Sequence, residues 1–321
     1  MTASAPSLDD AHAISRRITL LSVGTAVLLI VLKAFALGAS GSVSILATLA
    51  DSSLDLIASV AAFLAVRWAA APADEKHRHG HGKAEALASL VQSGLIFASA
   101  VFIGWEAVQR MFDPRPITAG GWAVGVVVIS ILVTAGLVWM QTQALKKTRS
   151  MAVAGDRAHY AADMAANVVV LIGVISGAWL KAPGLDAAAG LVVAVWLFWG
   201  AWSLMRDAAD HLLDGAVSDA ERTQIVSAVL SDPRIAGVHQ LRTRMAGQVM
   251  MVQMHIDLDG SLSLHDAHEI VVGAEQRIAQ AIPHADVLIH ADPRGHDDVL
   301  DRPGPAVAPA ATAMRGPWDQ A

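Results

Sequence analysis

Six long apolar segments constrain the fold of this chain more than any other feature. Each is long enough to supply the ~20 apolar residues that an α-helix needs to cross a bilayer. Hydrophobic residues make up 54% of the 321 residues, and charged residues only 16%. We therefore predict a membrane protein with a bundle of six transmembrane helices. The predicted spans are residues 18–37, 43–66, 84–112, 119–143, 153–180 and 184–205.

Basic residues flank these segments unevenly, and this predicts the orientation of the chain. Residues such as Arg16, Lys76 and Lys146 gather on one side of the predicted bundle, whereas the opposite loops hold few basic residues, such as Arg115 and Lys181. By the positive-inside rule, both termini are expected in the cytoplasm. The N-terminus is polar and acidic and lacks the pattern of a signal peptide, so the first span is expected to remain in the mature protein.

The pattern changes after Arg206 to that of a small soluble α+β domain. The expected order is helix, strand, strand, helix, strand, with the helices on one face of the sheet. Ser218, followed three residues later by Glu221, predicts a capping box at the start of the first helix. The helices are expected at residues 218–230 and 262–281, and the strands at residues 235–245, 249–258 and 285–290.

These patterns predict four parts of the chain. A short N-terminal cytoplasmic segment precedes the membrane domain, and a cytoplasmic α+β domain follows it. The last part is rich in Pro, Ala and Gly, which predicts a disordered tail to which we assign no role. The predicted boundaries are 1–15, 16–206, 207–293 and 294–321.

The composition of the soluble domain indicates what it binds. Residues 207–293 hold thirteen Asp or Glu against five Arg and no Lys, together with seven of the thirteen His of the chain. An acidic, His-rich surface suits cations and argues against nucleic acid, whose phosphates need basic residues. The chain has no Cys, which excludes disulfides and thiolate metal sites. Any metal ligands must therefore be His and carboxylate side chains.

Two pairs of ionisable residues lie inside predicted spans. Asp51 and Asp55 are four residues apart in the second span, and His159 and Asp163 repeat this spacing in the fifth. Residues at this spacing share one helix face. At 1.5 Å per residue, the first pair lies roughly 12 and 18 Å from one membrane face and the second roughly 9 and 15 Å from the other. Both pairs therefore fall near the middle of a ~30 Å hydrocarbon core.

Charged side chains at this depth need a compensating interaction. Each costs at least ~2.5–3.5 kcal/mol to place in the bilayer centre. Hydrogen bonding between helices, with a role in packing alone, is one interpretation. The other is a divalent metal ion, around which three carboxylates and an imidazole form a tetrahedral shell. The matched pairs favour the metal site.

The chain resembles the cation diffusion facilitator family, in particular its bacterial zinc and ferrous-iron efflux branch. The resemblance extends from about Arg16 to Pro293. It is carried by Asp51-Ser-Ser-Leu-Asp55, His159-Tyr-Ala-Ala-Asp163, the loop from Asp74 to Glu85, and His239-Gln-Leu-Arg-Thr-Arg. It implies a homodimeric, proton-coupled antiporter in the bacterial inner membrane, with six spans and a metallochaperone-like cytoplasmic domain. Divalent metal ions and protons are the implied ligands, Zn²⁺ first among the metals, with no organic cofactor.

The resemblance also implies particular site residues. The transport site falls on Asp51, Asp55, His159 and Asp163. A loop site falls on Asp74, His77 and His81, with His79 as an additional candidate ligand. Cytoplasmic sites fall on His239, His255, His268, His290 and Asp292, where Asp292 would bridge two ions. An inter-subunit charge pair falls on Lys83 and Asp214.

Other interpretations remain open from the residues alone. The loop residues also fit a solvated polar connector, and the histidines of the soluble domain fit ordinary surface positions. An intramembrane metalloenzyme would need a general base, typically in a His-Glu-x-x-His helix, and that motif is absent. A metal sensor would not need paired charges inside the membrane. A channel would differ from an antiporter in needing no pH gradient.

Oxygen ligands with one imidazole accept Zn²⁺, Cd²⁺, Fe²⁺, Co²⁺ or Mn²⁺, and four ligands favour Zn²⁺.

Overall fold

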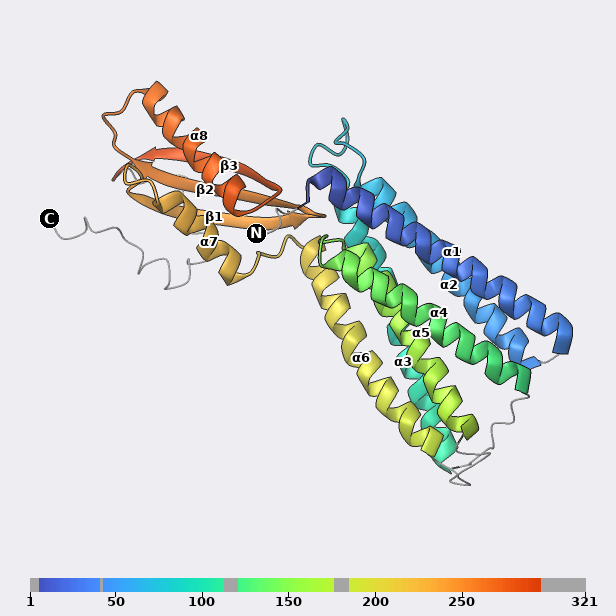
Figure 1. The fold of residues 1–321 in the computed structure, drawn as a ribbon. Helices are drawn as coiled ribbons and strands as arrows, with labels where there is room; N and C mark the ends of the chain where they lie inside the picture. The colour runs from blue at the N-terminus through green and yellow to red at the C-terminus, as the bar shows by residue number, and fades with distance from the viewer. Residues whose placement is uncertain (1–5, 41–42, 113–120, 176–184, 296–321) are drawn as a thin grey trace, which may run out of the picture. The chain divides into compact units, whose positions relative to one another are not determined.

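The chain divides into two compact units in the computed structural model, which describes residues 6–40, 43–112, 121–175 and 185–295. The unit Leu8–Leu212 consists of six helices. They are α1 (Leu8–Ser40), α2 (Val43–Ala69), α3 (Lys83–Phe112), α4 (Gly121–Leu145), α5 (Met151–Ile175) and α6 (Leu185–Leu212). Figure 1 shows them side by side as a bundle. This confirms the predicted transmembrane bundle.

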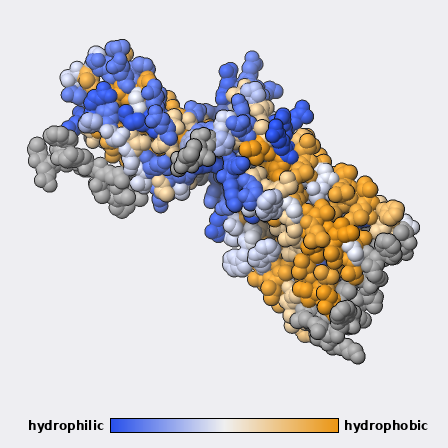
Figure 2. Space-filling view, viewed as in Figure 1, coloured by the Kyte–Doolittle hydropathy of each residue, from blue (hydrophilic) through white to orange (hydrophobic). Residues whose placement is uncertain are grey.

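The surface of the helical unit is apolar over most of its length. Among the described residues, five helices are long and apolar enough to cross a membrane. The exception, α5, carries Asp156, Arg157 and Asp163. Large side chains face outward, including Phe35 at 74% exposed and Val192 at 70% exposed, and Figure 2 shows hydrophobic residues gathered over these helices. Water would not stabilise such a surface, so the unit is an integral membrane domain.

Small residues let the helices of this unit approach one another closely. A Cβ atom at Gly104 of α3 would lie 3.4 Å from the Cβ of Ala194 in α6, and one at Gly190 of α6 would lie 3.2 Å from the Cβ of Ala107 in α3. On α5, a Cβ at Gly155 would collide with the side chain of Gln92. Small residues at helix interfaces are the usual means of packing in membranes, where burial from water contributes little. They hold α3 against both α6 and α5.

The second unit contains the predicted α+β domain. Its elements are α7 (Asp219–Leu230), β1 (Gly237–Ala246), β2 (Val249–Leu258), α8 (Leu264–Ala281) and β3 (Ala285–Pro293). The sheet has the order β1-β2-β3, with β1 antiparallel and β3 parallel to β2. Ser218 caps α7, and Glu221 completes the capping box. The predicted fold class is therefore confirmed.

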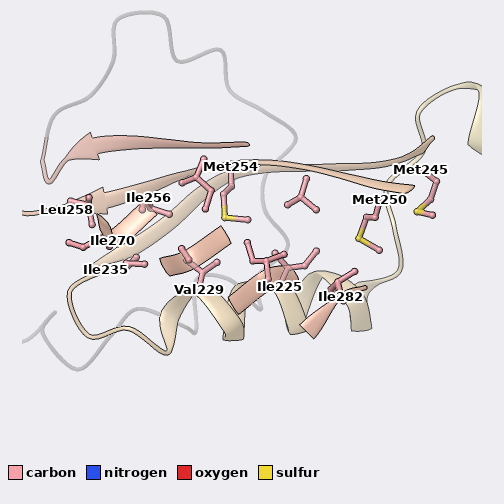
Figure 3. Packing of buried hydrophobic residues seen from close by; sticks show 14 residues of the cluster. Ile225, Val229, Ile235, Met245, Met250, Met254, Ile256, Leu258, Ile270 and Ile282 are labelled. Carbon is pink, nitrogen blue, oxygen red and sulfur yellow. The ribbon is translucent and has the colours of Figure 1, made fainter. Parts of the chain in front are cut away.

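Alternation along β2 separates the two faces of this sheet. Met250, Met254 and Ile256 are buried and contact the inner sides of α7 and α8, as Figure 3 shows. Residues in between, such as His255 and Asp257, belong to the opposite face because side chains alternate along a strand. One face thus forms the hydrophobic core, and the other is free to carry polar groups.

Several sequence predictions lie at least partly outside the described residues. They concern the tail beyond residue 295, the basic residues Arg115 and Lys181, and residues 119–120, 176–180 and 184 of the predicted spans. At the end of the helical unit, α6 continues to Leu212, past the predicted boundary after Arg206.

Candidate metal centres

The intramembrane cluster brings α2 and α5 together. His159 Nε2 lies 3.1 Å from Asp55 Oδ1 and 3.6 Å from Asp163 Oδ2. One ligand atom from each of these three residues lies within 4.8 Å of the others. Asp55 and His159 are buried, at 5% and 9% exposed. Asp51 lies one turn earlier on α2, is exposed, and is not part of this group.

This cluster combines two carboxylates with one imidazole in an apolar helical bundle. Two carboxylates near each other repel, and burial removes the water that would screen them. A divalent cation removes the repulsion, and oxygen and nitrogen ligands are those that zinc and related metals accept. On α5, the four-residue spacing places His159 and Asp163 on one helix face, and Asp55 of α2 lies against His159. The geometry therefore suits a metal cation.

A buried carboxylate that the sequence analysis did not identify lies beside this cluster. Asp156 is 0% exposed. It accepts hydrogen bonds from Gln141 Nε2 at 2.8 Å and Ser59 Oγ at 3.3 Å, and Ser59 Oγ lies 2.8 Å from the hydroxyl of Tyr160. These side chains join α2, α4 and α5. The signal in the sequence was a carboxylate within a predicted span, which is rarely found without a partner.

Lys33 was also not identified as a site residue. It lies on α1 and is 5% exposed. Its Nζ donates hydrogen bonds to the carbonyl of Thr48 at 3.1 Å and to the hydroxyl of Ser52 at 2.6 Å. The signal in the sequence was a single lysine inside the first predicted span.

The loop between α2 and α3 holds a second group. Asp74, His77 and His81 place one ligand atom each within 4.8 Å of one another. His81 Nε2 lies 3.2 Å from both Asp74 Oδ2 and His77 Nδ1, and its ring lies against Trp68 at 5.7 Å between centroids. Hydrogen bonds, chiefly from the backbone N–H of His77, hold the pKa of Asp74 below its usual range. His79 is exposed and outside this group.

A row of histidines crosses the polar face of the sheet. His239, His255 and His290 occupy paired positions on β1, β2 and β3. Asp292 Oδ2 lies 2.7 Å from His255 Nδ1 and 3.4 Å from His239 Nε2, while its Oδ1 lies 3.1 Å from His290 Nε2. His239, His255 and Asp292 form a group with metal-ligand spacing. The register of three strands thus assembles this site.

Two further positions complete the description of this domain. Asp257 lies beside the row, with its Oδ1 3.5 Å from His239 Nε2. It was not named as a ligand, although it shares the strand parity of His255. His268 lies on α8, is exposed, and is outside the group.

Lys83 and Asp214 each have a partner within the chain. Lys83 Nζ donates to the carbonyl of Leu212 at 3.1 Å, and Arg244 Nη1 donates to Asp214 Oδ1 at 3.1 Å. Their pairing between subunits stays a prediction.

Comparisons with known proteins extend over both units. The cation efflux transmembrane domain matches residues 19–213, and the cytoplasmic domain of cation efflux proteins matches residues 217–294. The cation-efflux pump FieF of Salmonella choleraesuis (strain SC-B67) is 39% identical over 277 residues, covering 86% of this chain and 92% of that protein. FieF of Salmonella newport (strain SL254) is 40% identical over 265 residues, covering 83% and 88%. The metal-bound C-terminal domain of the CzcD transporter from Thermotoga maritima is 28% identical and covers 25% of this chain and 93% of that chain, with a TM-score of 0.24.

These matches, together with the apolar bundle, make the protein a membrane transporter that exports metal cations, and not an enzyme. The similarity spans most of both the chain and its relatives. The chain belongs to the cation diffusion facilitator family.

Proposed function

We propose that this protein is a proton-coupled antiporter that exports divalent transition-metal ions from the bacterial cytoplasm, with Zn²⁺ as the preferred cargo. It works as a homodimer in the inner membrane, with both termini cytoplasmic. The observation that carries this proposal is the cluster of Asp55, His159 and Asp163 within the helical bundle. A buried cluster of this chemistry serves a cation that crosses the membrane.

Exchange for protons follows from the chemistry of these ligands. Carboxylates and imidazole must lose their protons to bind metal, so metal ions and protons compete for the same atoms. Alternating access to this one cluster therefore couples outward metal movement to inward proton movement. Asp51 completes the tetrahedral set in this proposal, by approaching from the neighbouring turn of α2.

The other two groups have supporting roles in the proposal. Asp74, His77 and His81 form a loop site near the end of α2. In the soluble domain, the two oxygens of Asp292 point to different histidines, which supports a carboxylate shared by two ions. His268 is a further ligand of the cytoplasmic sites in this proposal, and Lys83 pairs with Asp214 across the dimer.

Transport in vesicles tests the proposed function directly. Purified protein in proteoliposomes is expected to move Zn²⁺ when a pH gradient is imposed, and an ionophore that collapses the gradient is expected to stop concentrative flux. The same assay with Cd²⁺, Fe²⁺, Co²⁺ and Mn²⁺ ranks these ions by their transport rates. Flux that is indifferent to the pH gradient would indicate a channel and contradict the antiporter.

The selectivity of the transport site tests the role of His159. His159→Asp is expected to move preference from Zn²⁺ toward Mn²⁺ or Cd²⁺ by about tenfold or more, because a carboxylate oxygen replaces the imidazole nitrogen that suits zinc. Competition between Zn²⁺ and Mn²⁺ for flux measures the change. His265→Ala, which removes an exposed histidine of α8, serves as the control. Unchanged competition in His159→Asp would count against direct ligation by His159.

A further inference from the structure

Lys33 is a buried cation beside the proposed transport site. Its side chain leaves α1 and is anchored to α2 by hydrogen bonds to Thr48 and Ser52. These two residues flank Asp51 on that helix, three positions before it and one after. Placing a charged lysine within a membrane span costs free energy, and such a lysine faces a charged partner or a transport pathway. Hydrogen bonds to one carbonyl and one hydroxyl do not by themselves explain a buried lysine at this position.

The carboxylates of the transport site supply the missing partner charge. Ser52, which accepts a hydrogen bond from Lys33 Nζ, is the neighbour of Asp51 in the chain, and Asp55 follows one turn later on α2. Charges interact strongly over several ångströms in such surroundings, because little water is present to screen them. With three carboxylates at −1 each and one ammonium at +1, the side chains carry a net charge of −2. One divalent ion neutralises that charge, whereas without Lys33 the occupied site would remain at −1.

We propose that Lys33 is a built-in counter-cation of the transport site, which weakens the binding of divalent ions enough for them to be released. This inference rests on the proposed function, since it takes the carboxylates as metal ligands. The Lys33 ammonium, which is fixed to the protein, and the transported ion are both attracted by the negative charge of the carboxylates, and they repel each other. Lys33 therefore determines affinity without ligating the metal.

Metal affinity of Lys33 variants tests the proposal. The full-length protein is used in a His77→Ala, His255→Ala background, so that Zn²⁺ titration by calorimetry reports the transport site. Lys33→Met removes the charge and its hydrogen bonds, while Lys33→Gln removes the charge and keeps N–H donors. Both are expected to bind Zn²⁺ at least tenfold more tightly and to transport it more slowly, because release is slowed. Lys33→Arg keeps the charge and is expected to stay within about threefold of the parent affinity.

Controls separate this role from a structural one. Lys147→Met removes an exposed lysine after α4 and is expected to leave the affinity unchanged. If Lys33 only fastens α1 to α2, Lys33→Met will melt at a lower temperature while its affinity is unchanged or weaker. Unchanged or weaker binding in folded Lys33→Gln overturns the proposal. Asp163→Ala in the same background tests the site itself: if it still binds Zn²⁺ as the parent does, the proposed function fails whatever Lys33 does.

Discussion

Replacing Asp163 with alanine is expected to abolish metal flux, with a loss of at least about 100-fold in reconstituted vesicles. The side chain lies 3.6 Å from His159 and contributes one of the three clustered ligand atoms. Removing one ligand from the proposed four-ligand site would leave the metal poorly neutralised and the remaining carboxylates misplaced around it. Folding is expected to survive, because the change also removes a costly charge from the membrane interior.

The measurement needs a control for the loss of any carboxylate. Asp286→Ala removes an exposed aspartate of β3 and is expected to transport Zn²⁺ as the parent protein does. Size-exclusion chromatography checks that both variants remain folded. Parent-like flux through folded Asp163→Ala would exclude this residue from the transport site.

Zn²⁺ is expected to drive the soluble domain into a dimer and to raise its melting temperature by about 10–20 °C at saturating metal. Residues 207–293 carry a net negative charge, so two copies repel each other until bound cations neutralise part of it. The candidate ligands His239, His255 and Asp292 lie on the sheet face away from the hydrophobic core. Melting curves and mass measurement with and without EDTA test this.

A matched pair of variants identifies the ligands in that experiment. His255→Ala is expected to remove the metal-dependent shift, whereas His265→Ala, on the exposed surface of α8, is expected to retain it.

In the whole transporter, replacing both His239 and His290 is expected to lower turnover at low Zn²⁺ only, since bound ions favour the dimer through their higher affinity for it. Asp51→Ala is expected to stop transport at every Zn²⁺ concentration. The same concentration dependence in both variants would rule out a regulatory role for the domain.

Local patterns in the sequence were sufficient to predict most of the helices and strands of the fold. The apolar segments predicted six helices because a span must satisfy its own backbone hydrogen bonds in lipid. The Ser218 and Glu221 capping box predicted the start of α7, because its two hydrogen bonds involve neighbours in the chain. The alternation of side chains along a single strand likewise puts His255 of β2 on the face opposite the core.

The partners of buried polar residues could not be predicted in this way. Lys33 and Asp156 stood in apolar segments, and their sequence neighbours do not reveal that one lies against Ser52 and the other against Gln141. Asp257 had the right parity, but its approach to His239 depends on the pairing of β1 with β2.

The sequence by itself determined that the chain crosses a membrane, that any metal ligands must be carboxylates and imidazoles, and that two helices each carry two candidate ligands on one face. These properties depend on composition and on the periodicity of single helices. Only the tertiary structure decided that Asp55 joins His159 and Asp163 while Asp51 lies outside that group, and that Lys33 lies against Ser52 of α2. The physical reason is that helix packing and strand register set the distances between residues far apart in the chain, and neither is encoded in one segment alone.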